Sequence, residues 1–155
     1  MAALYFEDVE VGDRYTAGPY LVAKSEIIQF AKQYDPVPEN IDEEAAARSI
    51  FGGLTACSPH TFSIYILLTT QLRPKLHFLA GLGWDELRMP NAVRPSDSLD
   101  LELSVLEKRE SRSKSDRGVL RLRILLRNQR TETVLECLVT VLIRRRPDAE
   151  RADPH

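Results

Sequence analysis

A carboxylate and an amide stand five residues apart in the stretch YDPVPENIDEE, residues 34–44. Asp35 is followed by two prolines within three residues, and proline stiffens the chain by fixing its own φ and restricting the residue before it. Such a loop could present a carboxylate for acid–base chemistry, which usually needs a second titratable group. Asn40, where a histidine would serve, can orient a water molecule but cannot take its proton. An Asp before a proline is equally typical of an ordinary turn.

A second group of polar residues begins the most apolar stretch of the chain, SPHTFSIYILLTTQL. We expect Ser58 to be the N-cap of a helix and Pro59 its first residue, where the missing N–H has no cost. Unpaired N–H groups at a helix start favour a negatively charged oxygen. His60 could be a base one turn into the helix, or simply a hydrogen-bonded residue of the helix start. Cys57 is a weaker candidate, as a nucleophile that only His60 could assist.

The composition indicates one globular domain and excludes several classes of protein. The chain has 155 residues, is 43% hydrophobic and 28% charged, and carries a net charge of −2. A general nucleic-acid binder would show a basic excess, and a disordered chain would have fewer apolar residues. Cys57 and Cys137 form neither a disulfide framework nor a metal motif, and reduced thiols favour a cytoplasmic protein. The sequence shows no pattern typical of a signal peptide or a membrane-spanning stretch, so no membrane association is expected.

Three helices are expected in the first half of the chain. Ser25 should cap the first helix, whose apolar residues repeat with helical spacing until Pro36 ends it. The stretch DEEAAARS, residues 42–49, predicts a short helix capped by Asp42. The third helix, at about 59–72, is apolar on nearly all sides and should be wrapped by other elements.

After residue 79 the apolar residues alternate with polar ones, which is the period of a β-strand. Strands are expected at about 79–89, 99–105, 119–127 and 133–143, with short turns and no helices between them. This order predicts an antiparallel sheet and an α+β fold in which the sheet curls around the buried helix. An open sheet edge favours a dimer or a higher even oligomer. We expect one domain over residues 1–146, followed by a charged tail at 147–155.

Five stretches of the sequence together resemble one known family. They are YFEDVEVGDRY, IIQFAKQYDPVPENIDEEAA, FGGLTACSPHT, LGWDELRMPNAVRPSDSLDLELSVLEKRESRS and RNQRTETVLE, in this order within residues 5–146. The chain resembles the MaoC-like acyl dehydratases, relatives of the (R)-specific enoyl-CoA hydratases. The resemblance implies the hot-dog fold, a long antiparallel sheet wrapped around a central helix, and a homodimer with a CoA-thioester site at the subunit interface.

The resemblance also implies the chemistry of the site. In this family an Asp and a His five positions later activate a water molecule that adds across the double bond of a 2-enoyl thioester. The Asp falls on Asp35 and the His on Asn40, so the family's acid–base pair lacks its imidazole. Ser58 stands where the family commonly has Gly, and Pro59 removes one N–H donor from the helix start that would bind the thioester oxygen. Ser96 also replaces a usual Gly.

Several interpretations therefore remain open from the sequence. The main hypothesis is reversible hydration of a 2-enoyl-CoA, with no cofactor besides the thioester substrate and with activity altered by Asn40. The alternatives are a non-catalytic thioester-binding or structural subunit of a hetero-assembly, and a hot-dog thioesterase. Glu39 or His60 could supply a substitute base. A basic run could meet CoA phosphates or be a solvated hairpin end. It consists of Arg109, Arg112, Lys114 and Arg117.

Overall fold

The computed structural model describes residues 2–148, in which one strand precedes four helices and four further strands follow them. The expected tail at 147–155 lies almost entirely outside these residues. In chain order the elements are a 3₁₀ turn η1 (Phe6–Asp8), β1 (Arg14–Leu21), α1 (Lys24–Tyr34), α2 (Pro38–Ile41), α3 (Glu43–Ala47), α4 (Ser58–Thr69), β2 (Phe78–Arg88), β3 (Ser98–Glu110), β4 (Arg117–Arg127) and β5 (Thr133–Arg144).

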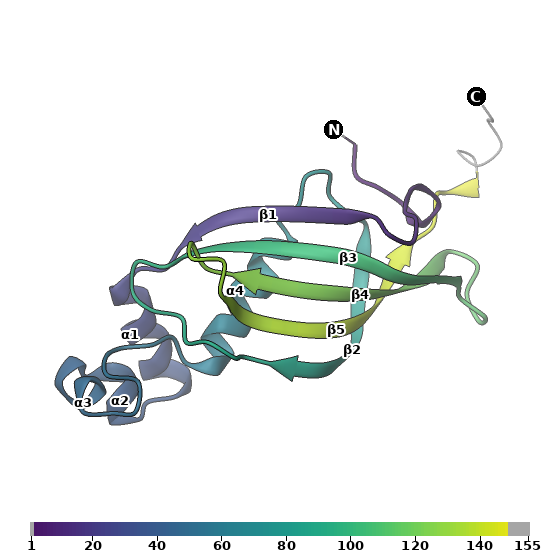
Figure 1. Ribbon diagram of the computed structural model, residues 1–155. Helices are drawn as coiled ribbons and strands as arrows, with labels where there is room; N and C mark the ends of the chain where they lie inside the picture. Colours follow the sequence, from purple (N-terminus) through teal and green to yellow (C-terminus); the bar gives the residue numbers. More distant parts are fainter. Residues whose placement is uncertain (1, 149–155) are drawn as a thin grey trace.

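The five strands form one antiparallel sheet in the order β1-β3-β4-β5-β2. Figure 1 shows α4 lying behind this curved sheet, with the short helices α1, α2 and α3 gathered in a lobe at one end. The hairpin between β3 and β4 projects at the opposite end of the sheet (Figure 1). The expected α+β arrangement, with the sheet around a helix, is confirmed.

Apolar residues at alternate positions of β3, together with their partners on β4, form much of the core. Leu101 and Leu103 of β3 are almost fully buried and lie opposite Leu126 and Ile124 of β4 in the sheet register. Glu102, between the two leucines on β3, is charged and lies on the outer face, whereas Leu125, between their partners on β4, is apolar and 5% exposed. Side chains on one face of a strand share one environment because their directions alternate. The period-two pattern of the sequence therefore corresponds to one buried and one solvated face.

Helix α4 is buried on one side only. Ile64, Tyr65 and Leu68 are at most 3% exposed and face the sheet, whereas Ile66 and Leu67 are 38% and 40% exposed. The expectation that this helix is wrapped on most sides is therefore wrong for a single chain. An apolar side of α4 is left uncovered, next to the edge strand β2.

Two expected helix caps are wrong, and one is confirmed. Helix α1 begins at Lys24 after Ala23, so Ser25 lies inside its first turn and does not cap it. Ser58 is the first residue of α4 rather than its N-cap, because the Cys57 carbonyl already accepts hydrogen bonds from the His60 and Thr61 N–H groups. Asp42 does cap α3, since its side chain accepts a hydrogen bond from the Ala45 N–H at 2.8 Å.

The turn before β3 explains why glycine is usual at the position of Ser96. Ser96 has a φ of 69°, in the left-handed region that residues with a Cβ seldom adopt. Its N–H donates to the Val22 carbonyl at 2.7 Å, which ties this turn to the end of β1. The backbone therefore keeps the glycine conformation although the residue is serine.

Replacing Ser96 by glycine should stabilise the fold. A left-handed residue with a Cβ is strained by about 1–2 kcal/mol, and glycine loses about 0.5–1 kcal/mol through its freedom in the unfolded chain, so Ser96→Gly should raise the free energy of unfolding by ~0.5–1 kcal/mol. Urea denaturation measures this change. Ser98→Gly in the extended strand β3 is the matched control and should lower stability. A loss of stability in both variants would contradict the account.

Candidate functional site

Asp35 lies directly after the last residue of α1. Its N–H donates to the Ala31 carbonyl at 2.8 Å and completes the last helical turn, while its own φ of −155° turns the chain away from the helix. Its carbonyl then accepts the Val37 N–H at 2.9 Å. The backbone on both sides of Asp35 is therefore hydrogen-bonded, and the carboxylate is held at a defined place, as the two prolines predict.

A short helix that the sequence did not predict brings Asn40 back to Asp35. Helix α2 begins at Pro38, a favourable first residue because its missing N–H has no partner to lose. One turn later the Asn40 amide nitrogen Nδ2 donates to the Asp35 carboxylate at 3.0 Å and to the Asp35 carbonyl at 3.2 Å. The two positions of the motif are thus in contact, with an amide where an imidazole is expected. Glu39 is exposed, and Asn40 makes the contact instead.

The start of α4 forms the second part of the candidate site. Ser58 and Pro59 are both exposed in the first turn, where N–H groups lack helical partners. Pro59 is the second residue of the helix and contributes no donor, so the Ser58 N–H and hydroxyl are left to meet a ligand. A hollow of about 160 Å³ opens beside this turn. Among the residues that line it are Phe51, Thr55, Ser58, Thr61, Asn91 and Val93.

The Cys57 thiol does not fit the role of a nucleophile. The residue is 6% exposed, and burial raises the pKa of the thiol. The Asp35 carboxylate raises this pKa further, and the hydrogen bond with the His60 backbone, which lowers it, does not offset the two effects. Because a thiolate is the reactive form, the shift makes Cys57 less reactive.

His60 lies in the first turn of α4 and points into the protein rather than towards solvent. It is 2% exposed, and its ring nitrogen Nε2 is 2.8 Å from Glu26 Oε1 on α1. The ring stacks on Phe30 with centroids 4.5 Å apart. Neither contact could be predicted from the sequence, since Glu26 and Phe30 lie 30 or more residues from His60.

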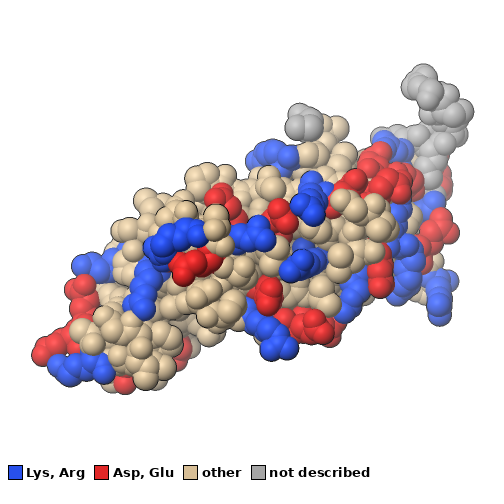
Figure 2. All heavy atoms as spheres, in the orientation of Figure 1, with Lys and Arg blue, Asp and Glu red and all other residues tan. Residues whose placement is uncertain are grey.

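The basic run and the other two histidines do not join this site. His77 stacks on Tyr5, and His155 is outside the described residues. The basic run of residues 109–117 belongs to the β3–β4 hairpin, at the end of the sheet opposite the helical lobe (Figure 1). Within one chain it therefore cannot reach a ligand at Asp35. Figure 2 shows blue and red residues interspersed over the outer face of the sheet, without a broad surface of one sign.

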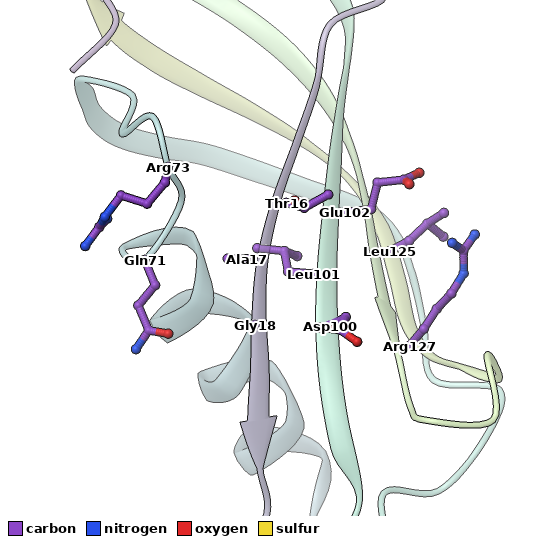
Figure 3. Close-up of a pocket in the computed structure, with 10 residues that line it drawn as sticks. All are labelled: Thr16, Ala17, Gly18, Gln71, Arg73, Asp100, Leu101, Glu102, Leu125 and Arg127. Atoms are coloured by element: carbon purple, nitrogen blue, oxygen red, sulfur yellow. The ribbon is translucent and has the colours of Figure 1, made fainter. Parts of the chain in front are cut away.

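A hollow of about 510 Å³ crosses the edge strand β1 and does not form a convergent site. Figure 3 shows Arg73 and Gln71 on one side of β1, and Glu102 and Arg127 on the other side, pointing away from them. Within residues 2–148, no three His, Cys, Asp or Glu side chains gather in a way that could hold a metal ion. In the same part of the chain, no helix has the length and apolar character to cross a membrane.

Comparison with known proteins identifies the class of fold and then the family. The crystal structure of a MaoC-like dehydratase from Rhodospirillum rubrum superposes with a TM-score of 0.87 at 39% identity, covering 94% of this chain and 99% of that one. The (R)-hydratase PhaJ1 of Pseudomonas aeruginosa superposes with a TM-score of 0.73 at 22% identity, over 93% and 88% of the two chains. A Mycobacterium tuberculosis protein described as a double hot-dog fold is also similar, with a TM-score of 0.75 at 18% identity over 94% of this chain and 46% of that one. The fold is the hot-dog fold.

The MaoC like domain matches residues 8–124, which is most of the chain. The uncharacterized protein YdeM of Bacillus subtilis (strain 168) is 27% identical over 140 residues, covering 90% of this chain and 98% of that protein. The chain therefore belongs to the MaoC-like domain family, and the resemblance seen in the sequence is confirmed.

The buried state of the thiols can be tested chemically. In the native protein at pH 8, Cys57 and Cys137 should react with a thiol reagent far more slowly than free cysteine, because burial raises the pKa of both thiols, that of Cys137 to about 11. Both should react at the ordinary rate in urea. A Cys57→Ser variant assigns the two rates. Fast native labelling of Cys57 would contradict its burial and reopen its candidacy as a nucleophile.

Proposed function

We propose that this protein binds acyl-CoA thioesters and catalyses reversible hydration of a 2-enoyl-CoA, with Asp35 as the acid–base group. Membership of the MaoC-like family supports the reaction class. The observation that carries the proposal is the 3.0 Å hydrogen bond from Asn40 Nδ2 to the Asp35 carboxylate. It keeps the two positions of the family's motif together and fixes the carboxylate, although no imidazole is present.

The chemistry then rests on one titratable group. Asp35 takes a proton from water as the water oxygen bonds to C3 of the enoyl thioester, and the C2–C3 double bond becomes an enolate. The protonated Asp35 returns that proton to C2, which completes the hydroxyacyl thioester and regenerates the carboxylate. Because Asn40 donates through Nδ2, its Oδ1 can accept a hydrogen bond from the attacking water. The thioester is the substrate, and this scheme uses no further cofactor.

The start of α4 is the proposed place for the thioester oxygen, which becomes negatively charged in the enolate. The Ser58 N–H and hydroxyl can donate to it, and the helix dipole favours negative charge there. Since Pro59 supplies no donor, this oxyanion site is weaker than a turn with two free N–H groups. The loss of one such donor costs on the order of 10²–10³ in rate in other enzymes, which predicts a slow catalyst.

The proposed assembly is a homodimer in which a second copy covers the uncovered side of α4 and the edge strand β2. Exposed apolar side chains gather on these two elements, and an apolar hollow of about 200 Å³ opens between them. The exposed apolar residues of α4 and β2 are Ile66, Leu67, Leu79, Leu82, Trp84 and Leu87. The outer edge of β2 also lacks a neighbouring strand among the described residues. Open edges and apolar patches of this kind are usually covered in solution.

Two substitutions at the motif test the proposed chemistry. Asp35→Asn should abolish hydration of crotonyl-CoA and of longer enoyl-CoA substrates while acyl-CoA binding by calorimetry persists. Asn40→His supplies a second acid–base group and should raise the rate by a substantial part of the ~10²–10⁴ typical of such a group. Loss of the enoyl-thioester absorbance measures the rate. Both variants need matching unfolding curves, so that the comparison reports chemistry and not folding.

The same assay separates the alternatives. Wild-type protein that binds acyl-CoA without turnover, even after Asn40→His, would be a non-catalytic thioester-binding subunit. Release of free CoA thiol in place of hydration would indicate a thioesterase that uses Asp35 to activate water at the carbonyl. Asn40 itself favours the first alternative, because it removes the titrating partner. Either result would overturn the proposed hydratase.

The homodimer has its own test. Light scattering should give about twice the chain mass of 17.6 kDa at micromolar concentration. Ile66→Lys places a charge on the apolar side of α4 and should shift the protein towards the monomer, whereas Val11→Lys is the control at an exposed apolar residue outside α4 and β2. A monomeric wild type would contradict the proposed assembly.

A further inference from the structure

A chain of hydrogen bonds joins three elements of the fold at one carboxylate. The Tyr20 hydroxyl on β1 donates to Glu26 Oε1 at 2.6 Å, and His60 Nε2 on α4 lies 2.8 Å from the same oxygen. Glu26 is in the first turn of α1. One oxygen thus connects the edge of the sheet, the start of the helix that ends at Asp35, and the first turn of the helix that would hold the thioester.

The His60 ring is also fixed on its face. It is nearly parallel to the Phe30 ring, with an interplanar angle of 7°. Phe30 in turn contacts Tyr34, the last residue of α1, with ring centroids 4.9 Å apart. Glu26, Phe30 and Tyr34 follow one another along one side of α1, because residues four apart share a helix face. The ring of His60 therefore packs between the first turn of α4 and the side of α1 that ends at Tyr34, and Asp35 is the next residue.

The two ring nitrogens of His60 have different surroundings. Nδ1 is buried and has no hydrogen-bond partner within residues 2–148. The Glu26 carboxylate supplies an acceptor, so Nε2 carries a hydrogen. This contact holds the ring in one orientation. Such a carboxylate on one ring nitrogen fixes both the tautomer and the orientation of an imidazole.

We propose that His60 is a positioning residue for the reaction at Asp35. Held by Glu26 at Nε2 and by Phe30 on its face, it sets the spacing between the Asp35 carboxylate and the first turn of α4. The inference rests on the proposed function for its kinetic consequence and on the contacts above for its geometry. Displacing a reacting group by about 1 Å can cost on the order of 10²-fold in rate, so a change at this distance from the substrate should still lower kcat.

Two substitutions at His60 separate hydrogen bonding from space filling. The amide nitrogen of glutamine can take the place of Nε2, whereas that of asparagine can take only the place of Nδ1. His60→Gln should therefore keep the donor to Glu26 and most of kcat, while His60→Asn should lower kcat about 10- to 100-fold with little change in KM. If His60 had a purely structural role, His60→Gln and His60→Asn would change kcat alike, through their effect on protein stability.

A second pair of substitutions, at Glu26, tests the same contact in case the His60 variants do not fold. Glu26→Ala removes the acceptor from a partly exposed position and should lower kcat, while Glu26→Gln keeps an acceptor oxygen and should retain most of it. Gln29→Ala, an exposed residue of the same helix, is the matched control and should leave kcat unchanged. Equal kcat values for all Glu26 and His60 variants would overturn the positioning role.

Two measurements on the wild type and His60→Asn do not depend on turnover. Nitrogen-15 NMR of the His60 ring should show a hydrogen on Nε2, the nitrogen that contacts Glu26. Hydrogen exchange should be faster in His60→Asn for the amides of residues 35–41, and unchanged in the middle of β4. A bare Nε2, or equal exchange at residues 35–41, would refute the inference. A wild type that meets both expectations but hydrates no enoyl thioester would refute the proposed function alone.

Discussion

Burial of one side of α4 against the curved sheet is the constraint on which the rest of this structure depends. Tyr65 and Leu68 fill the inner face of the sheet together with the alternating leucines of β3 and β4. Each such side chain contributes about 1.5–3 kcal/mol when it is fully buried. The same packing places the first turn of α4 at the end of the sheet that carries the helical lobe (Figure 1). The position of the proposed thioester site follows from the position of the core helix.

The helical lobe is attached to that core through polar contacts as well as packing. His60 and Glu26 join α4 to α1, and Asp35 lies at the far end of α1. The Asn40 amide then fixes the carboxylate from the other side. An amide can donate and accept hydrogen bonds but does not titrate near neutral pH. In the proposed reaction Asn40 therefore orients Asp35 and a water molecule, and the proton chemistry is left to the carboxylate alone.

The sequence predicted those features that have a local cause. The strands follow from alternation with period two, the end of α1 from Pro36, and the cap of α3 from Asp42. The start of α4 was wrong by one residue, because Pro59 is acceptable at either of the first two positions and only the hydrogen bonds to the Cys57 carbonyl decide between them. Ser96 stood out as a missing glycine, and its positive φ supplies the reason.

Features with a tertiary cause were not predictable. Glu26 looked like an ordinary acidic residue in a first helical turn, and its contact with His60 joins residues 34 positions apart. The half-exposed side of α4 was also missed, because an all-apolar helix has the same pattern whether its cover comes from its own chain or from another. The contact between Asn40 and Asp35 needs helix α2, whose four residues are too few to show a period.

In the proposed reaction one carboxylate, Asp35, both takes the proton from water and returns it to C2. The direct measurement is hydration of a trans-2-enoyl-CoA in D₂O, followed by proton NMR of the relative configuration at C2 and C3. A single group acting from one side of the substrate predicts that deuterium and hydroxyl add to the same face. Addition to opposite faces would require a second acid on the other side of the double bond and would contradict the account.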